Sequence, residues 1–75
     1  MPPKNGYFSY HGAIRKLLTQ NKLLFWYFTD DHNGIAPALV LVFDDAKHPV
    51  MPVRREKWNI YLPLLPKNKR TILRP

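Results

Sequence analysis

Cysteine is absent from this chain, which excludes a disulfide framework and a thiolate metal site. Long apolar runs are absent too: residues 23–28 and 35–43 are far shorter than the roughly 20 residues of a membrane-spanning helix. The three glycines form no phosphate loop or nucleotide fingerprint, so we expect no small-molecule cofactor. No apolar signal segment follows the first residues, and we therefore expect a cytoplasmic protein.

Acidic residues are few: five Asp and Glu stand against twelve Lys and Arg in 75 residues, a net charge of +7. Residues 1–46 carry four charges of each sign, whereas residues 47–75 carry eight cations and Glu56 alone. Basic segments are typical of proteins that bind a polyanion, because each neutralised phosphate releases counterions. The alternative is a solvated tail that aids solubility. We expect phosphate contacts from Arg54, Arg55, Lys57, Lys67, Lys69 and Arg70, with Arg15 and Lys16 extending the surface.

The first regular element is predicted after Ser9, a residue type that favours the N-cap of a helix. Apolar residues then recur at the spacing of one helical face, at Tyr10, Ala13, Ile14, Leu17 and Leu18. Asn21 tolerates the left-handed conformation that ends a helix. The sequence therefore predicts a helix between Ser9 and Asn21.

Three strands and a second helix are predicted next. Runs of β-branched and aromatic residues indicate strands at residues 23–29, 38–43 and 49–54, with a reversal at Asn33 and Gly34. Pro52 restricts the third strand to a sheet edge, and residues 55–62 form a brief helix that Pro63 stops. We expect a small single α+β domain at residues 1–66. Its order is α-β-β-β-α, with a three-stranded antiparallel sheet packed on one face by helices, followed by a basic, flexible tail at residues 67–75. Residues 63–75 are expected to be extended.

The predicted sheet is apolar on both faces. Alternation puts Leu23, Phe25 and Tyr27 on one side of the first strand and the residues between them on the other. Two helices cannot easily cover both faces, so the tail, a second copy or another partner is expected to cover one. We expect an interface at Leu24, Trp26, Phe28, Leu39 and Leu41. Exposed aromatics on a sheet also stack nucleotide bases, although ordinary core packing is the alternative for these rings.

Histidines and aspartates are the remaining candidates for a metal site or for catalysis. Asp30, Asp31 and His32 precede the second strand, whereas Asp44, Asp45 and His48 follow it. Six strand residues separate the two groups by roughly 20 Å, so we expect no metal site. His48 lies near Arg54 and Arg55 in sequence, and a histidine with cations suffices for an RNase-like reaction.

The expected element order is similar to that of the double-stranded-RNA-binding fold, which small toxins of the HicA type also use with a histidine on a strand. The resemblance implies an RNase-like toxin as one alternative. The chain lacks the glycine-serine-histidine signature of those toxins and the lysine-rich helix start of double-stranded-RNA-binding domains. No triad spacing is present either, so we expect a protein that is not an enzyme.

Two functions fit these observations. The first is a non-catalytic nucleic-acid-binding accessory protein that contacts phosphates through its basic C-terminal segment. The second is an interaction or inhibitor module of a phage or mobile element, which binds a partner protein or a second copy of itself through an apolar sheet face. Salt dependence separates the two, because phosphate contacts weaken with added salt and apolar contacts do not.

Overall fold

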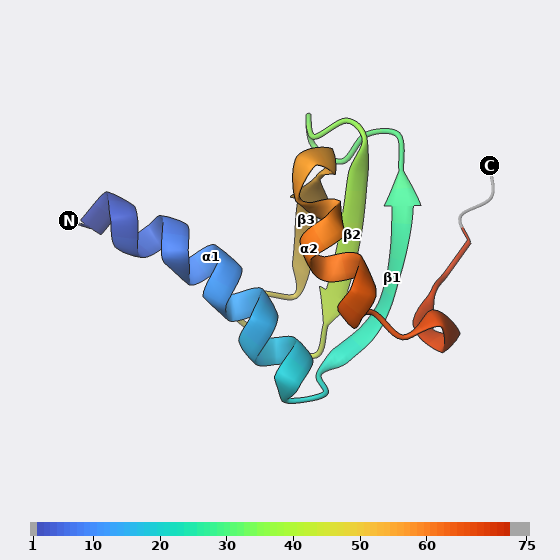
Figure 1. Ribbon diagram of the computed structural model, residues 1–75, viewed down its shortest axis with the longest axis horizontal. Coiled ribbons are helices and arrows are strands. Elements are labelled where there is room, and N and C mark those ends of the chain that lie inside the picture. Colours follow the sequence, from blue (N-terminus) through green and yellow to red (C-terminus); the bar gives the residue numbers. More distant parts are fainter. Residues whose placement is uncertain (1, 73–75) are drawn as a thin grey trace.

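The sheet and helices have the predicted α+β arrangement, with both helices on one side of a three-stranded antiparallel sheet (Figure 1). The computed structural model describes residues 2–72, and side chains from residue 10 onward. Strand β1 spans Leu23–Thr29, β2 spans Ala38–Phe43 and β3 spans Val50–Arg54. The spatial order is β1-β2-β3, which leaves β2 in the centre and β3 at an edge. The predicted edge position of Pro52 is therefore confirmed.

The reversal between β1 and β2 lies where the sequence predicts it. Asn33 and Gly34 have φ values of 50° and 92°, a region that glycine and asparagine tolerate best. Across this turn the His32 amide donates to the Ile35 carbonyl at 2.9 Å, and the Ile35 amide donates back at 3.0 Å. The turn thus fixes the register of the hairpin.

Helix α1 begins earlier than the sequence predicts, because it spans Pro2–Thr19. Ser9 lies inside the helix, so its prediction as the N-cap is wrong. Pro2 and Pro3 occupy the first turn, where a missing N–H costs no intrahelical hydrogen bond, and they therefore do not end the helix. In the described part of the chain, no helix is long and apolar enough to cross a membrane.

The predicted end of α1 is confirmed. Asn21 takes a φ of 59°, and its amide donates to the Leu18 carbonyl at 3.1 Å. The Lys22 amide donates to the Leu17 carbonyl at 3.0 Å. This pair of hydrogen bonds is a Schellman motif, which satisfies the last carbonyls of the helix and turns the chain into β1.

The second helix is a series of short turns. A 3-10 turn at Arg55–Lys57 leads into α2, Trp58–Tyr61, and a further 3-10 turn follows at Leu62–Leu64. Pro63 was expected to stop the helix, but it lies at the start of that last turn, where its missing N–H is tolerated. The Trp58 indole donates to the Val53 carbonyl at 2.8 Å, which anchors the helix on β3.

Both helices pack on the same face of the sheet (Figure 1). The buried residues between them come from both helices, all three strands and the segment after the second helix: Ile14 and Leu17 of α1, Leu23 and Trp26 of β1, Leu39, Leu41 and Phe43 of β2, Met51 and Val53 of β3, Tyr61 of α2, and Leu65. Two of the apolar residues predicted for the first helix, Ile14 and Leu17, are buried in this core, whereas Tyr10 is 42% exposed. The face that carries this core is called the covered face below.

A β-bulge at the start of β1 changes the predicted alternation. Leu23 pairs with Phe43 and Phe25 pairs with Val42, so Leu24 is the extra residue. Leu23 therefore belongs to the covered face and is buried, whereas Leu24 is 53% exposed. The prediction that Leu23 shares a side with Phe25 is wrong for this reason.

The segment after Pro66 lies along the outer edge of β1 instead of running extended. Lys67–Lys69 form a 3-10 turn, which departs from the prediction. The Trp26 indole donates to the Pro66 carbonyl at 2.8 Å, and the Thr71 amide donates to the Trp26 carbonyl at 2.8 Å. The flexibility expected for residues 67–75 in solution stays a prediction, and residues 73–75 lie outside the described part.

Two leucines from the expected interface test which face is the core. Leu41→Ala should lower the free energy of unfolding by about 2–5 kcal/mol, because it leaves a cavity under the helices. Leu24→Ala removes an exposed side chain and should change the unfolding free energy by no more than about 0.5 kcal/mol. Urea unfolding followed by tryptophan fluorescence measures both, and equal losses would contradict the assignment of the covered face.

Candidate nucleic-acid interface and neighbouring pocket

The sheet face opposite the helices carries no helix of the described chain (Figure 1). The strand register places three rows of residues on it: Thr29, Ala38 and Arg54, then Tyr27, Val40 and Pro52, then Phe25, Val42 and Val50. Arg54 is the charged residue of this set, and the set has no carboxylate. These nine residues are called the uncovered face. Its composition is apolar with a positive corner.

Two aromatic rings lie next to each other on the uncovered face. Phe25 and Tyr27 have ring centroids 6.2 Å apart and planes inclined by 22°. Phe25 is 36% exposed, and Val50 in the same row is 44% exposed. Sequence reasoning grouped Phe25 and Tyr27 on one side of the strand, but it did not single them out, because both sides of that strand are aromatic.

The basic C-terminal segment docks on the outer edge of β1, the strand that carries these rings. The Lys69 ammonium donates to the Leu23 carbonyl at 2.8 Å, and Arg70 forms a parallel bridge with Trp26. The Arg70 guanidinium carbon lies 5.7 Å from the Trp26 ring centroid and 5.1 Å from that of Phe28. Trp26 and Phe28 belong to the covered face, so Arg70 leans to that side of the edge.

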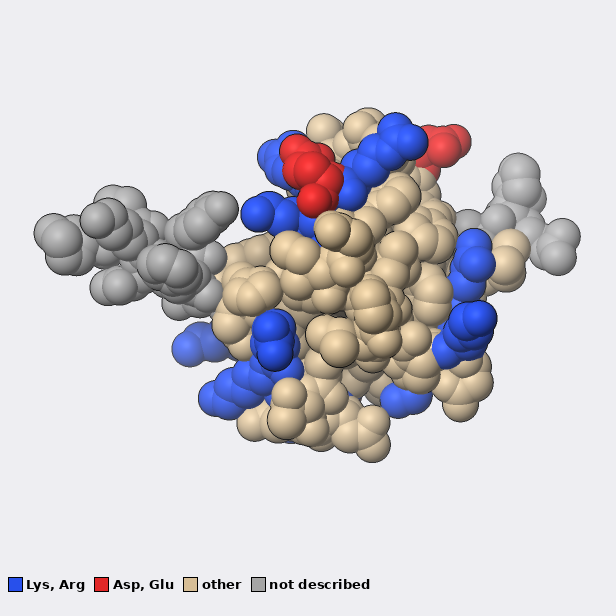
Figure 2. Space-filling view, viewed as in Figure 1, with Lys and Arg blue, Asp and Glu red and all other residues tan. Residues whose placement is uncertain are grey.

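The predicted phosphate-contacting residues do not form one continuous patch on the helix side of the molecule. Figure 2 shows lysine and arginine side chains in separate groups: over the start of the second helix, along the C-terminal half of α1, and at the C-terminal segment. Within residues 10–72, no lysine or arginine forms an ion pair with a carboxylate. These side chains thus keep their charge available, although Lys69 and Arg70 also bind β1.

The structure places most of the expected interface residues in the core. Trp26, Leu39 and Leu41 are buried beneath the helices, and Phe28 packs against them. Leu24 is exposed at the bulge and lies off the uncovered face. The interface set therefore falls largely on the covered face, because the chain's own helices cover these residues. The apolar side chains that the helices leave uncovered belong to the alternate residues of the strands, on the uncovered face.

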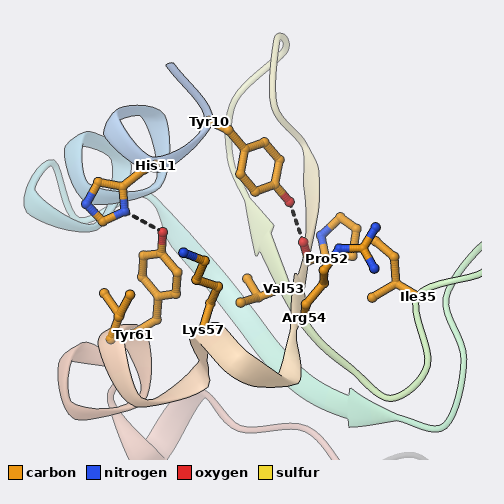
Figure 3. A pocket seen from close by; sticks show the side chains of 9 residues that line it. Tyr10, His11, Ile35, Pro52, Val53, Arg54, Lys57 and Tyr61 are labelled. Carbon is orange, nitrogen blue, oxygen red and sulfur yellow. Dashed lines mark hydrogen bonds between the residues drawn. The ribbon is translucent and has the colours of Figure 1, made fainter. Parts of the chain in front are cut away.

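A pocket of about 780 Å³ lies at the free edge of β3, between this strand and the two helices (Figure 3). Tyr10 and His11 of α1 form one wall, and Ile60 and Tyr61 of α2 form another. Two cations, Arg54 and Lys57, line the pocket together with Ile35, Pro52 and Val53. None of its lining residues is acidic.

Hydrogen bonds fix the aromatic walls of this pocket. The Tyr10 hydroxyl donates to the Pro52 carbonyl, an acceptor on the free edge of β3. The His11 Nδ1 and the Tyr61 hydroxyl are 2.6 Å apart (Figure 3). Burial and the charge of Tyr61 raise the pKa of Tyr10, while the charge of Arg54 lowers it. Burial also raises the pKa of Tyr61, while the charge of Arg15 lowers it. Both phenols are therefore neutral at neutral pH.

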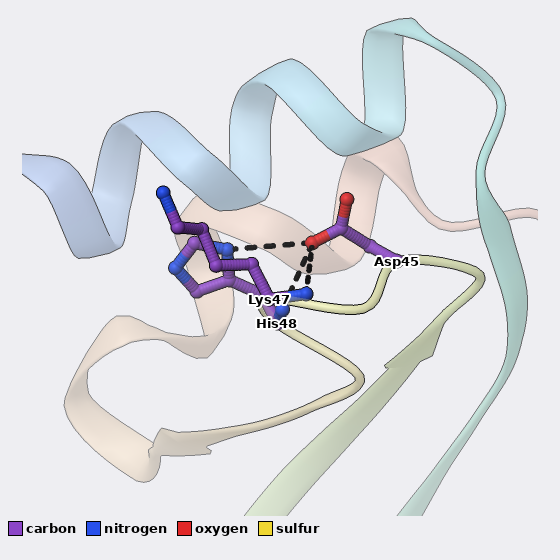
Figure 4. Close-up of polar contacts among 3 residues, drawn as sticks. All are labelled: Asp45, Lys47 and His48. Atoms are coloured by element: carbon purple, nitrogen blue, oxygen red, sulfur yellow. Dashed lines mark hydrogen bonds and ion pairs between the residues drawn. The ribbon is translucent and has the colours of Figure 1, made fainter.

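His48 is held by the turn between β2 and β3 (Figure 4). The Asp45 carboxylate accepts hydrogen bonds from the amides of Lys47 at 3.1 Å and His48 at 2.8 Å, and it lies 3.5 Å from His48 Nδ1. Arg54 is at the other end of β3, roughly 15 Å or more along the strand. The fold does not bring His48 to the cations that an RNase-like reaction would use.

A shared metal site is also not formed in the part of the chain that the structure describes. Its histidine, aspartate and glutamate side chains contain no group of three or more that could hold an ion. Asp45 acts as a turn acceptor, which is an ordinary structural role for an aspartate at a reversal. His11 and Tyr61, which meet at the pocket, are 50 residues apart, so no local sequence pattern signals them.

The turn at Asp45 should respond to acid. The His48 amide hydrogen bond lowers the pKa of Asp45 below its ordinary value of 3.8, helped by the Lys47 amide and the His48 ring and opposed by desolvation. A carboxyl whose pKa is lower in the folded state contributes stability that is fully present above its unfolded pKa. This stability is lost as the pH falls through the folded pKa. We predict that the amide signals of Lys47 and His48 move together below about pH 3.8 in NMR spectra. Asp45→Asn keeps an oxygen that accepts hydrogen bonds but has no carboxyl group to titrate. If the amide signals of Lys47 and His48 still moved in the same way in this variant, their movement would not be due to Asp45.

No family model matches this chain, and neither a curated protein nor a solved structure matches it. The likeness to the double-stranded-RNA-binding fold therefore rests on element order alone. The candidate functional residues are those that the fold itself brings together, namely the Phe25–Tyr27 pair with the basic edge of β1, and the pocket beside β3.

Proposed function

We propose that this chain is a non-catalytic, cytoplasmic nucleic-acid-binding accessory protein that binds a single strand on its uncovered face. One observation carries the proposal: the basic C-terminal segment docks on the edge of β1, the strand that carries the stacked Phe25 and Tyr27 rings. Bases would stack on the two rings, while phosphates would contact Lys67 and Lys69. Aromatic rings with an adjacent positive groove are the usual means of binding single strands.

The aromatic pair suits bases because it is accessible and already ordered. Phe25 is 36% exposed and stands 6.2 Å from Tyr27 on a strand paired along its length with β2. Each stacked base contributes about 1–3 kcal/mol, whatever its identity. A duplex hides its bases within its own stack, so this pair favours a single strand.

The charge distribution supports the same ligand class. The uncovered face has a positive corner at Arg54 and no carboxylate, and the whole chain carries a net charge of +7. Within residues 10–72, the lysines and arginines make no ion pair with a carboxylate that a phosphate would have to displace. Arg15 and Lys16 on α1, and Arg55 beside α2, add to the long-range attraction for a polyanion.

A partner protein on the same face is the second candidate. Val50 is 44% exposed beside Phe25 and Val42, and such a row also suits an apolar protein surface. A second copy of the chain would bring two faces with positive corners together. The like charges make this self-association the less favoured occupant.

Replacing both rings by leucine separates stacking from general apolar contact. Phe25→Leu with Tyr27→Leu should weaken binding of a labelled single-stranded oligonucleotide at low salt by about 5- to 150-fold per ring, since stacking is lost and apolar area is kept. Fluorescence anisotropy measures the affinity, and Leu24→Ala is the matched control with wild-type binding. No binding by the wild type at low salt would overturn the proposed function, as would equal binding by the double variant.

Replacing Lys67 and Lys69 by glutamine tests the phosphate contacts. The slope of log affinity against log salt should become shallower by about 0.7 for each lysine, because each contact with a single strand releases counterions in that proportion. Lys47→Gln, which removes a charge from the turn after β2, is the control. An unchanged slope in the Lys67→Gln, Lys69→Gln variant would place the phosphate contacts elsewhere.

A further inference from the structure

We infer that the pocket at the free edge of β3 is a site for a nucleoside monophosphate, either as a free molecule or as the phosphorylated end of a strand. The pocket uses none of Phe25, Tyr27, Lys67 and Lys69, on which the proposed function rests, although it shares Pro52 and Arg54 with the uncovered face. Its volume of about 780 Å³ lies within the range of small-molecule sites.

The charge of the lining selects an anion. Arg54 and Lys57 both line the pocket, and none of the described residues that line it is acidic. Within residues 10–72 neither side chain is neutralised by a carboxylate. Each of these cations suits a phosphate group, because an arginine fork binds two of its oxygens and a lysine ammonium binds one as a point charge.

The rest of the lining selects a ligand with a flat, apolar body. Ile35, Val53 and Ile60 supply aliphatic surface, and the ring of Tyr10 is 42% exposed at the rim. In Figure 3 the labelled side chain of Tyr61 stands on the side of the two helices, Arg54 and Ile35 stand on the opposite side, and Tyr10 reaches from α1 to Pro52 between them. An inorganic anion would use only the cations, whereas a nucleoside monophosphate would use both parts of the pocket.

The walls are ordered before any ligand enters. The Tyr10 hydroxyl is bonded to the Pro52 carbonyl, and the Tyr61 hydroxyl is bonded to His11 Nδ1 at 2.6 Å. Fixing aromatic side chains in advance reduces the entropy lost on binding. Because burial raises the pKa of both phenols, neither becomes an anion that would repel a phosphate near neutral pH.

Titration of the whole chain with adenosine 5′-monophosphate, followed by amide and side-chain NMR shifts, tests the inference. We expect saturable shifts at Tyr10, Lys57 and Ile60, and affinity at least about tenfold weaker for adenosine or inorganic phosphate, since each uses one half of the pocket. Arg54→Gln and Lys57→Gln should each weaken the nucleotide by about tenfold or more. Arg55→Gln removes the same charge from a neighbour that does not line the pocket, and it should leave affinity within about twofold.

Two oligonucleotides, identical except for a 5′-phosphate, distinguish the sources of the ligand. If the pocket takes a strand end, the phosphorylated form binds more tightly and Lys57→Gln removes that advantage; equal binding of the two assigns the pocket to free nucleotides. The Phe25→Leu, Tyr27→Leu variant should bind the mononucleotide like the wild type, so the pocket and the proposed function fail separately. Equal affinity for inorganic phosphate and the nucleotide would overturn the inference, as would an Arg55→Gln effect as large as that of Lys57→Gln.

Discussion

Trp26 connects three parts of the molecule through one residue. Its side chain is buried beneath the helices, its indole donates to the Pro66 carbonyl, and its own carbonyl accepts the Thr71 amide. Arg70 lies over the same ring. The position of the basic segment at the edge of β1 therefore depends on a core residue, and loss of the indole would affect the core and the proposed interface together.

The unequal covering of the two sheet faces is the second constraint on the molecule. Ala38 and Val40, in the central strand of the uncovered face, are fully buried. Phe25 and Val50 remain exposed on the same face. A ligand that removes this apolar surface from water gains about 25 cal/mol for each Å². In a 75-residue chain, such residues lie outside the core that stabilises the fold and are available for binding.

Local sequence patterns predicted the elements of this fold, but not the side of the sheet that the helices cover. The strand runs and the Asn33–Gly34 reversal are encoded by neighbouring residues, and the structure has them at the expected positions. The bulge at Leu24 and the packing of α1 depend on contacts between distant segments. Both faces of β2 are apolar, so alternation alone could not distinguish core from surface.

The candidate site was harder to predict for a related reason. The charge excess after residue 46 is plain in the sequence, yet the fold disperses these cations over separate regions. Lys69 lies at the edge of β1 because its ammonium reaches the Leu23 carbonyl, 46 residues away. His11 and Tyr61 likewise meet through tertiary structure. Residue types indicated a polyanion as partner, but only the fold indicates which cations adjoin an aromatic surface.

Salt acts in opposite directions on the two ligand classes that suit the uncovered face. Two unit charges 10 Å apart in water interact by about 0.4 kcal/mol, and physiological salt screens most of this over a Debye length of about 8 Å. Added salt therefore removes the repulsion that a net charge of +7 sets between two copies and favours apolar self-association. The same salt opposes counterion release and weakens binding to a nucleic acid. A face that is both apolar and bordered by unneutralised cations thus favours a nucleic acid at low ionic strength and a protein surface at high ionic strength.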